Sequence, residues 1–461
     1  MKRILSILIL FLPALLVGQT LKKLTVQEQT EDINYIQSEL VKLHPGIYTY
    51  QSESEFREGF DFLKKSLIED QTVFEFYQKL VPVINNIGCG HTTVKFPSND
   101  LRKLQKSRKL LPIEVQIIDD KIYITKMLVK NSDVESGNEI ISINDIPSSQ
   151  LLNENLMLYP SDGRILSRKY QMMGKYFSIN FSKFHIVEEE FELEVKSNST
   201  IQKTQLQGIT YDDYLNKTLK PNEKDLEFEI IDSLAAALIT IRNSSTRKKF
   251  SEFLESSFHQ IQNTGIQNLI IDLRYDSFNR DHDGAELYSY ITDTVFSYYR
   301  KLEVTEYYDV PKALKWITHY PIEQDSTGHH YWTIHADLNE QYPKPSPFQG
   351  NVFVLTDGFT FSATTEFSSI VKSNERGLIV GIETGGGYYG NNSGGMLIRQ
   401  LPNSKLKVVV PPMKYIMAVR DLGNYSRGVI PDIPVHININ EVISGKDQIL
   451  NTAINLITLS Q

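Results

Sequence analysis

The sequence contains a single cysteine, lacks any stripe of cationic residues and, beyond its first residues, has no apolar run long enough to span a membrane. With Cys89 alone, no intramolecular disulfide can form. A net charge of -8 argues against a nucleic-acid partner, because binding phosphates requires clustered cations. Internal repeats and low-complexity segments are also absent. The chain divides instead into zones of different hydrophobic pattern.

The composition is that of a large soluble globular protein. Of its 461 residues, 41% are hydrophobic and 23% are charged. A chain of this length exceeds what one core usually organises, so two or three domains are expected. It can bury a large core without metals or disulfides, and nothing in the sequence implies a cofactor.

The amino-terminal residues have the pattern of an export signal. Lys2 and Arg3 precede an apolar stretch over residues 4–17, and the small Gly18 marks a cleavage point before Gln19. The stretch is shorter than the about 20 residues of a membrane-spanning helix. No cysteine lies nearby, which excludes a lipoprotein anchor. We therefore expect residues 1–19 to be a signal peptide, and a periplasmic or secreted protein without a membrane anchor after cleavage.

Residues 25–87 carry helical periodicity. Ile33, Ile36 and Leu40 recur at helical spacing until His44-Pro45-Gly46 interrupts the run, and residues 56–67 and 74–83 repeat the stripe. Three amphipathic helices are predicted, packed as a cap over residues 20–108.

Residues 111–195 change to the pattern of short strands. Ile113, Val115 and Ile117 alternate with polar residues. Farther on, a turn at Gly137 precedes a β-branched strand that ends at the next turn, Asn144-Asp145. We expect a β module over residues 109–199, followed by a polar segment whose later part, near Pro221, is a linker.

The remaining residues, 224–461, have an α/β pattern. Continuous apolar runs at 269–273, 352–355 and 378–381 are typical of buried parallel strands, and residues 363–371 have helical spacing. Strand, helix and strand joined by short links form a βαβ unit, which predicts a parallel or mixed sheet.

Ser362 lies where one of these strands turns into the predicted helix. A serine at such a junction can expose its hydroxyl at the carboxyl end of a sheet, and the helix amino terminus offers free N–H groups to an oxyanion. The local sequence alone equally suits a helix cap, formed by Thr360 or Ser362 with Glu366 downstream.

The wider pattern resembles the tail-specific (carboxyl-terminal processing) and tricorn-type serine peptidases. The resemblance spans nearly all of the mature chain, from about residue 25 to 435. It is carried, in order, by Gly-Cys-Gly-His-Thr at 88–92, the run at 269–274, Thr-Phe-Ser-Ala at 360–363, Val-Gly-Ile-Glu-Thr-Gly-Gly at 380–386 and Gly-Val-Ile-Pro-Asp-Ile at 428–433. The resemblance implies a multidomain α/β fold with a helical amino-terminal cap, a PDZ-like β module and a crotonase-like catalytic core with a mixed sheet. Its substrates would be peptides or proteins.

The resemblance also assigns roles to single residues. Ser362 matches the nucleophile, and the backbone N–H of Ala363 belongs to the oxyanion hole. Gly387 occupies the position of the tail-specific lysine, which excludes a Ser-Lys dyad there. The histidine-containing branch uses instead the residue that matches His91, and a histidine can accept the serine proton near neutral pH. A core histidine with a structural role is the alternative for His91.

Two departures from the family pattern leave activity open. The glycine pair that supplies the second oxyanion donor is missing from residues 272–279, and Gly284 could replace it. Losing one such donor typically removes about 3 kcal/mol of transition-state stabilisation. The family's glutamate before Gly428 is also missing, leaving Asp421 as the nearest carboxylate. An exported serine peptidase and a catalytically degenerate peptide-binding protein of the same fold are therefore the two hypotheses.

Three further patterns in the sequence are weaker indications of function. Cys89, two residues from His91, could act as a nucleophile, although a buried free cysteine is the simpler interpretation. The glycines at 385–387 resemble a phosphate loop, but no Lys-Ser/Thr follows them, and they favour instead a backbone bent close to Ser362. A possible metal-ligand group, which we weigh below a solvated surface, consists of His329, His330, His335 and Asp337.

Overall fold

A computed structural model describes most of the chain. The residues described are 22–97, 106–130, 133–185, 189–197, 200–218, 223–275, 278, 280–310 and 321–459. The expected signal peptide, residues 1–19, lies outside them. Within these ranges no helix combines the length and apolarity needed to cross a bilayer.

Three helices form the amino-terminal cap, as predicted. They are α1 (Val26–Leu43), α2 (Glu53–Lys65) and α3 (Val73–Asn85), with the short strands β1 (Lys23–Leu24) and β2 (Gln71–Thr72) paired beside them. Each helix begins with a capping box, in which Thr25, Ser52 or Thr72 exchanges hydrogen bonds with a glutamate three residues later. The predicted apolar stripes are buried between the helices.

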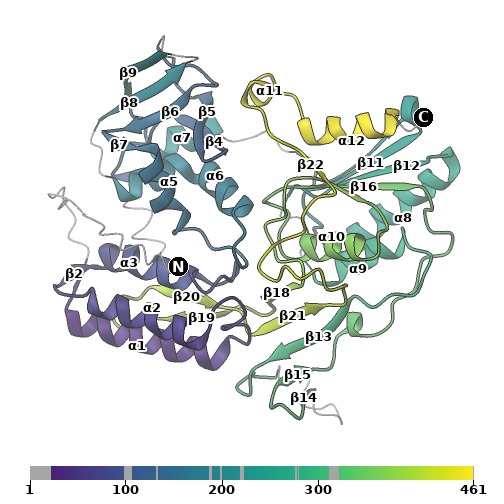
Figure 1. Ribbon diagram of the computed structural model, residues 1–461, viewed down its shortest axis with the longest axis horizontal. Helices are drawn as coiled ribbons and strands as arrows, with labels where there is room; N and C mark the ends of the chain where they lie inside the picture. Colours follow the sequence, from purple (N-terminus) through teal and green to yellow (C-terminus); the bar gives the residue numbers. More distant parts are fainter. Residues whose placement is uncertain are drawn as a thin grey trace.

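A hairpin from the far end of the chain completes the core of the cap. Strands β19 (Leu397–Gln400) and β20 (Lys407–Val410) pair in the order β19-β20-β3 with β3 (Thr93–Lys95), and they lie among the cap helices in Figure 1. Asp32 of α1 accepts the backbone N–H groups of Asn403 at 2.7 Å and Ser404 at 2.8 Å. The sequence segment 20–108 thus does not contain its whole core.

A separate five-stranded path of antiparallel strands forms the β module. Its order is β4-β5-β6-β8-β9, with the short β7 beside β6. The turns Asp119-Asp120 and Asn144-Asp145 have positive φ at both residues, as tight hairpins require. The bounds are β4 (Ile113–Ile118), β5 (Lys121–Met127), β6 (Glu139–Ile143), β7 (Ile146–Pro147), β8 (Glu190–Ser197), β9 (Thr200–Gln207), α5 (Ser148–Leu156), α6 (Ser167–Phe184) and α7 (Tyr211–Thr218).

The β8–β9 hairpin crosses the boundary expected at residue 199. Strand β9 is polar because one of its faces is solvent-exposed, and its buried positions, Thr204 and Leu206, are few. Helix α6 covers the other edge of this sheet. The Ser178 hydroxyl donates to the carbonyl of Ile113 at 2.9 Å, and a side chain at Gly174 would begin 3.0 Å from the carbonyl oxygen of Val115.

The carboxyl-terminal region contains the predicted mixed sheet. Its order is β10-β11-β12-β16-β17-β22, with β10 antiparallel to β11 and the other neighbours parallel. Helices α8, α9 and α10 cover one face, and α12 covers the other (Figure 1). The bounds are β10 (Leu226–Ile231), η1 (Asp232–Leu234), β11 (Ala236–Ile241), α8 (Arg247–Thr264), β12 (Asn268–Asp272), α9 (His282–Ser289), β16 (Asn351–Thr356), α10 (Ala363–Ser373), β17 (Leu378–Gly381), β22 (Ile433–Pro434), α11 (Ile439–Ile443) and α12 (Gln448–Leu459).

A second sheet lies between this core and the cap (Figure 1). Its order is β14-β15-β13-β21-β18, and it was not predicted from the sequence. The bounds are β13 (Tyr299–Val304), β14 (Ile322–Gln324), β15 (His330–Trp332), η3 (Ala336–Leu338), β18 (Gly390–Ser393) and β21 (Met413–Met417). The chain is therefore a multidomain α/β protein with several sheets, in agreement with the expected fold class.

Candidate active site

Ser362 occupies a strained turn between β16 and α10. Its backbone angles are φ 59° and ψ −130°, a conformation that non-glycine residues rarely adopt. Holding a residue there costs of order 1–3 kcal/mol, and such strain persists where the surroundings impose it. A serine on a sharp strand-to-helix turn is the geometry of a nucleophile elbow, which exposes the hydroxyl at the top of a sheet.

Neighbouring threonines, and not Ser362, satisfy the polar groups of this turn. Thr360 donates its hydroxyl to the carbonyl of Leu273 at 2.8 Å and accepts the N–H of Asp357 at 3.0 Å. Thr364 accepts the N–H of Phe361 at 3.0 Å. Ser362 itself makes no capping hydrogen bond, so the helix-cap alternative for Ser362 is wrong.

The glycine loop at 385–387 passes directly beside the elbow. A Cβ at Gly386 would lie 2.6 Å from the Thr365 hydroxyl oxygen and 3.1 Å from the backbone nitrogen of Ser362, and the N–H of Gly385 donates to the carbonyl of Thr360 at 2.8 Å. The expected close approach of these glycines to Ser362 is confirmed, because a side chain at Gly386 would have no room.

A buried carboxylate joins this loop to the turn that carries His91. Asp162 accepts the N–H of Gly90 at 2.8 Å and that of Gly387 at 3.2 Å. Burial raises the pKa of Asp162 to about 6, against the effect of these two hydrogen bonds. Asp162 could not be recognised from the sequence, since no local pattern marks it.

His91 is held as a neutral imidazole. Burial lowers its pKa to about 3, with a further contribution from the charge of Arg168 and an opposing one from a backbone hydrogen bond with Asn392. Its ring packs on Phe361 at a centroid distance of 4.7 Å, and the guanidinium of Arg168 lies 3.4 Å from the same Phe361 ring centroid. The imidazole is therefore in the form that can accept a proton.

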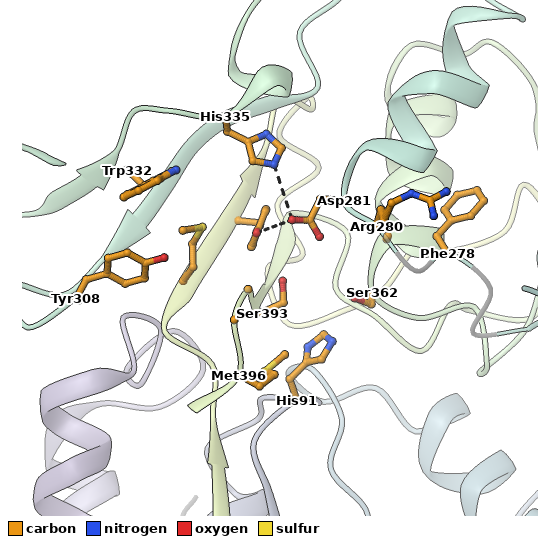
Figure 2. Close-up of a pocket in the computed structure, with 15 residues that line it drawn as sticks. His91, Phe278, Arg280, Asp281, Tyr308, Trp332, His335, Ser362, Ser393 and Met396 are labelled. Atoms are coloured by element: carbon orange, nitrogen blue, oxygen red, sulfur yellow. Dashed lines mark hydrogen bonds and ion pairs between the residues drawn. The ribbon is translucent and has the colours of Figure 1, made fainter. Parts of the chain in front are cut away.

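His91 and Ser362 line one cavity of about 420 Å³ (Figure 2). Among the described residues, no hydrogen bond joins the Ser362 hydroxyl to the His91 ring, and the buried Nδ1 of His91 has no partner. Catalytic hydrogen bonds are often long or poorly aligned without substrate, so this geometry is compatible with a base that engages when a peptide binds. Ala363, at the amino terminus of α10, lines the same cavity.

Gly284 is not brought to this cavity. It lies in the first turn of α9 and not in a loop, and a side chain at this position would begin 2.0 Å from the Tyr298 hydroxyl and 3.4 Å from the Cβ of Phe367. The structure therefore does not support the suggested role of Gly284 as second oxyanion donor. Asp421 does not line this cavity either; it accepts a hydrogen bond from the Tyr389 hydroxyl at 2.8 Å.

The structure also places the weaker candidates, Cys89 and the histidines considered as metal ligands. Cys89 is 1% exposed, and burial raises the pKa of its thiol to about 12, which disfavours the nucleophilic thiolate. His329 contacts Glu303 at 2.9 Å, whereas His335 faces Asp281 at 3.8 Å inside the Ser362 cavity. Across the described ranges, no group of three or more metal-ligating side chains gathers.

Residues 236–435, which include the mixed sheet and the elbow, match the model of peptidase family S41. The matched segment is similar to this family and makes up less than half of the chain. The resemblance found in the sequence is thereby confirmed, and the family is one of serine peptidases. Comparison with curated proteins finds no match.

Solved structures of similar fold align with most of the chain. Mature CPAF complexed with lactacystin aligns with a TM-score of 0.64 and 13% identity, covering 94% of this chain and 98% of that chain. Mature CPAF alone gives the same TM-score and identity, with 94% and 97% covered. The photosystem II D1 C-terminal processing protease is more distant, with a TM-score of 0.43 and 14% identity over 91% of this chain and 98% of that chain. At these identities the likeness to CPAF shows the fold alone.

Proposed function

We propose that this chain is an exported serine peptidase in which Ser362 attacks the peptide carbonyl and His91 accepts its proton. The observation that carries the proposal is the strained elbow at Ser362, whose side chain makes no helix-cap hydrogen bond and lines a cavity shared with a neutral histidine. Fixing a nucleophile and its base on rigid elements provides the orientation that acyl transfer requires.

In this mechanism the carbonyl carbon of the substrate gains the bond to the Ser362 oxygen while the serine proton passes to His91. The N–H of Ala363 stabilises the oxyanion, assisted by the amino terminus of α10. His91 then returns the proton to the leaving amine, and water hydrolyses the acyl-enzyme by the reverse sequence of proton transfers. With a pKa of about 3, His91 is a ready acceptor but a weakly basic one, so a substrate that completes its surroundings would strengthen it.

A fluorophosphonate probe tests this proposal. The wild type should be labelled at Ser362, and Ser362→Ala should not be labelled. Ser393 lines the same cavity, so Ser393→Ala is the matched control and should retain labelling. Because residues that act as one unit are non-additive, Ser362→Ala, His91→Ala and the double variant should lose peptidase activity to a similar floor, on the order of 10⁴-fold or more below the wild type.

A catalytically degenerate peptide-binding protein is the second candidate. It is favoured by two observations, the missing hydrogen bond between the described Ser362 and His91 side chains and the distance of Gly284 from the cavity. A wild type that resists the probe and cleaves no peptide in a broad library would select this candidate over the peptidase.

The β module would hold extended peptide ends in a PDZ-like manner. Helix α6 covers the β4 edge, which leaves β9 as the edge of this sheet for β-augmentation. Hydrophobic carboxyl-terminal peptides should bind, and amidating their carboxyl end should weaken binding. Equal binding of free and amidated peptides would show that the module does not capture a carboxylate.

Export follows from the signal pattern of residues 1–19. Intact-mass analysis of protein recovered from the periplasm or medium should give a mature chain that starts near Gln19 or Thr20. A mature form that retains Met1 would contradict this part of the proposal.

A further inference from the structure

The cavity beside Ser362 contains a carboxylate that the proposed hydrolysis does not use. Asp281 precedes α9, and its side chain remains 43% exposed. Its Oδ2 accepts a hydrogen bond from the Tyr415 hydroxyl at 2.7 Å and faces Nε2 of His335 at 3.8 Å (Figure 2). With this exposure, the carboxylate of Asp281 forms part of the cavity wall that a ligand would meet.

Asp281 is ionised, and among the residues that the structure describes no lysine or arginine pairs with it. Burial raises its pKa, but hydrogen bonds from His335 and Tyr415 outweigh that effect and leave the pKa below its ordinary value. Arg280 also lines the cavity, but its guanidinium pairs with the buried Asp283 at 2.7 Å and points away from Asp281 in Figure 2.

The two histidines of the cavity do not neutralise this charge. His91 is neutral, as described above. The ring of His335 lies between two carboxylates, with Nε2 3.8 Å from Asp281 and Nδ1 3.8 Å from Asp337, so it is not a dedicated counter-charge of Asp281. One negative charge therefore remains on the cavity wall.

Aromatic rings and thioethers form the surrounding wall. Tyr308 packs on Trp332 at a centroid distance of 5.5 Å, and Tyr415 packs on the edge of His335 at 6.2 Å. Met396 and Met413 fill the remainder. Aromatic faces and a carboxylate together attract ammonium and guanidinium groups, whereas a neutral or anionic group would leave the Asp281 charge desolvated and unpaired.

We propose that this cavity is a specificity subsite that binds a cationic group beside the scissile bond, with Asp281 as its counter-charge. The inference rests on the proposed peptidase function and adds its substrate class, peptides bearing lysine or arginine. The cavity volume of about 420 Å³ is within the range of sites that enclose small organic groups. The same chemistry is offered by a free peptide amino terminus, so the experiment must separate the two sources.

The first experiment compares matched peptides that differ only in charge. Lysine is replaced by norleucine and arginine by citrulline at each position flanking the cleaved bond, with free or acetylated amino termini. The wild type should cleave the cationic peptides about 10- to 100-fold more efficiently, as expected for a charged hydrogen bond. Loss of this preference on acetylation alone would identify the amino terminus as the cation.

Variants of Asp281 separate a subsite from a role in orienting His91. Asp281→Asn can still accept a hydrogen bond from Tyr415, and it should abolish the charge preference, because kcat/KM should fall about 10- to 100-fold more for the cationic peptides than for the norleucine peptides. Asp281→Glu should retain the preference, as should the surface control Asp145→Asn, whose side chain is 87% exposed. An equal loss on cationic and neutral peptides, or no preference in the wild type, would overturn the subsite.

A binding measurement makes the inference independent of catalysis. In the Ser362→Ala background, fluorescence anisotropy should show tighter binding of the lysine peptide than of its norleucine match, and adding Asp281→Asn should remove the difference. Charge-dependent binding together with an unreactive wild type would retain the subsite and refute the peptidase. Cleavage without any charge preference would refute the subsite and retain the peptidase.

Discussion

The backbone strain at Ser362 leads to a prediction that does not depend on activity. Replacing Ser362 by alanine or by glycine removes the hydroxyl in both cases, but only glycine accepts φ 59° and ψ −130° without strain. Relief of strain should contribute about 1–3 kcal/mol. The greater freedom of glycine in the unfolded chain opposes this by about 0.5–1 kcal/mol. Ser362→Gly should therefore be at least as stable as Ser362→Ala, by about 0–2.5 kcal/mol.

Urea unfolding followed by circular dichroism measures this difference. Ser368 provides the matched control, because it is fully buried on the same helix, α10, in ordinary helical geometry. There glycine should be less stable than alanine by about 1 kcal/mol. If Ser362→Gly shows the same deficit as Ser368→Gly, the turn is not strained, and the elbow argument for the nucleophile fails.

Three further predictions concern the same region. Because the pKa of His91 is about 3, kcat/KM should be flat from about pH 5 to 8; a limb near pH 6.5 in a pH-rate profile would show an unperturbed histidine. Burial, with the charge of Asp281, raises the pKa of Glu366 to about 8 from its ordinary value of 4.5. The contribution of Glu366 to the free energy of unfolding is therefore complete below pH 4.5 and declines as the pH rises toward 8. Glu366→Gln should reduce this decline, by at most about 1.4 kcal/mol per pH unit in urea titrations, and an unchanged pH dependence would contradict it. Gly386→Ala should destabilise the fold by about 1–3 kcal/mol and slow probe labelling, whereas Gly395→Ala, which meets nothing within 4 Å, should change neither.

Local chemistry explains which elements could be predicted from the sequence. Apolar spacing and capping residues predict the cap helices. Unbroken apolar runs predict the buried strands at 268–272 and 351–356. Ser362 could be recognised because the pattern of a strand-to-helix junction is formed by residues that are adjacent in the sequence. The pH profile expected for an ordinary histidine does not apply to His91, because its burial arises from residues distant in the sequence, among them Phe361 and Arg168.

The residues missed are those whose surroundings are assembled by the fold. Asp162 follows α5 with no motif around it, yet it joins the loops of His91 and Gly387. Asp281 and His335 are 54 positions apart in the numbering and meet only because the β13–β15–β21 sheet folds against α9. Gly284 was proposed as the replacement for the missing glycine pair, but it lies within α9 and packs against Tyr298.

The β19–β20 hairpin has a consequence for the order in which the protein can be made. The cap helices leave the ribosome first, but Leu401, Leu406, Val408 and Val410, which fill their core, follow more than 300 residues later. Until then the apolar faces of α1 to α3 stay uncovered, and long-range pairing of this kind is slow to form. The amino-terminal third therefore cannot complete its fold during synthesis.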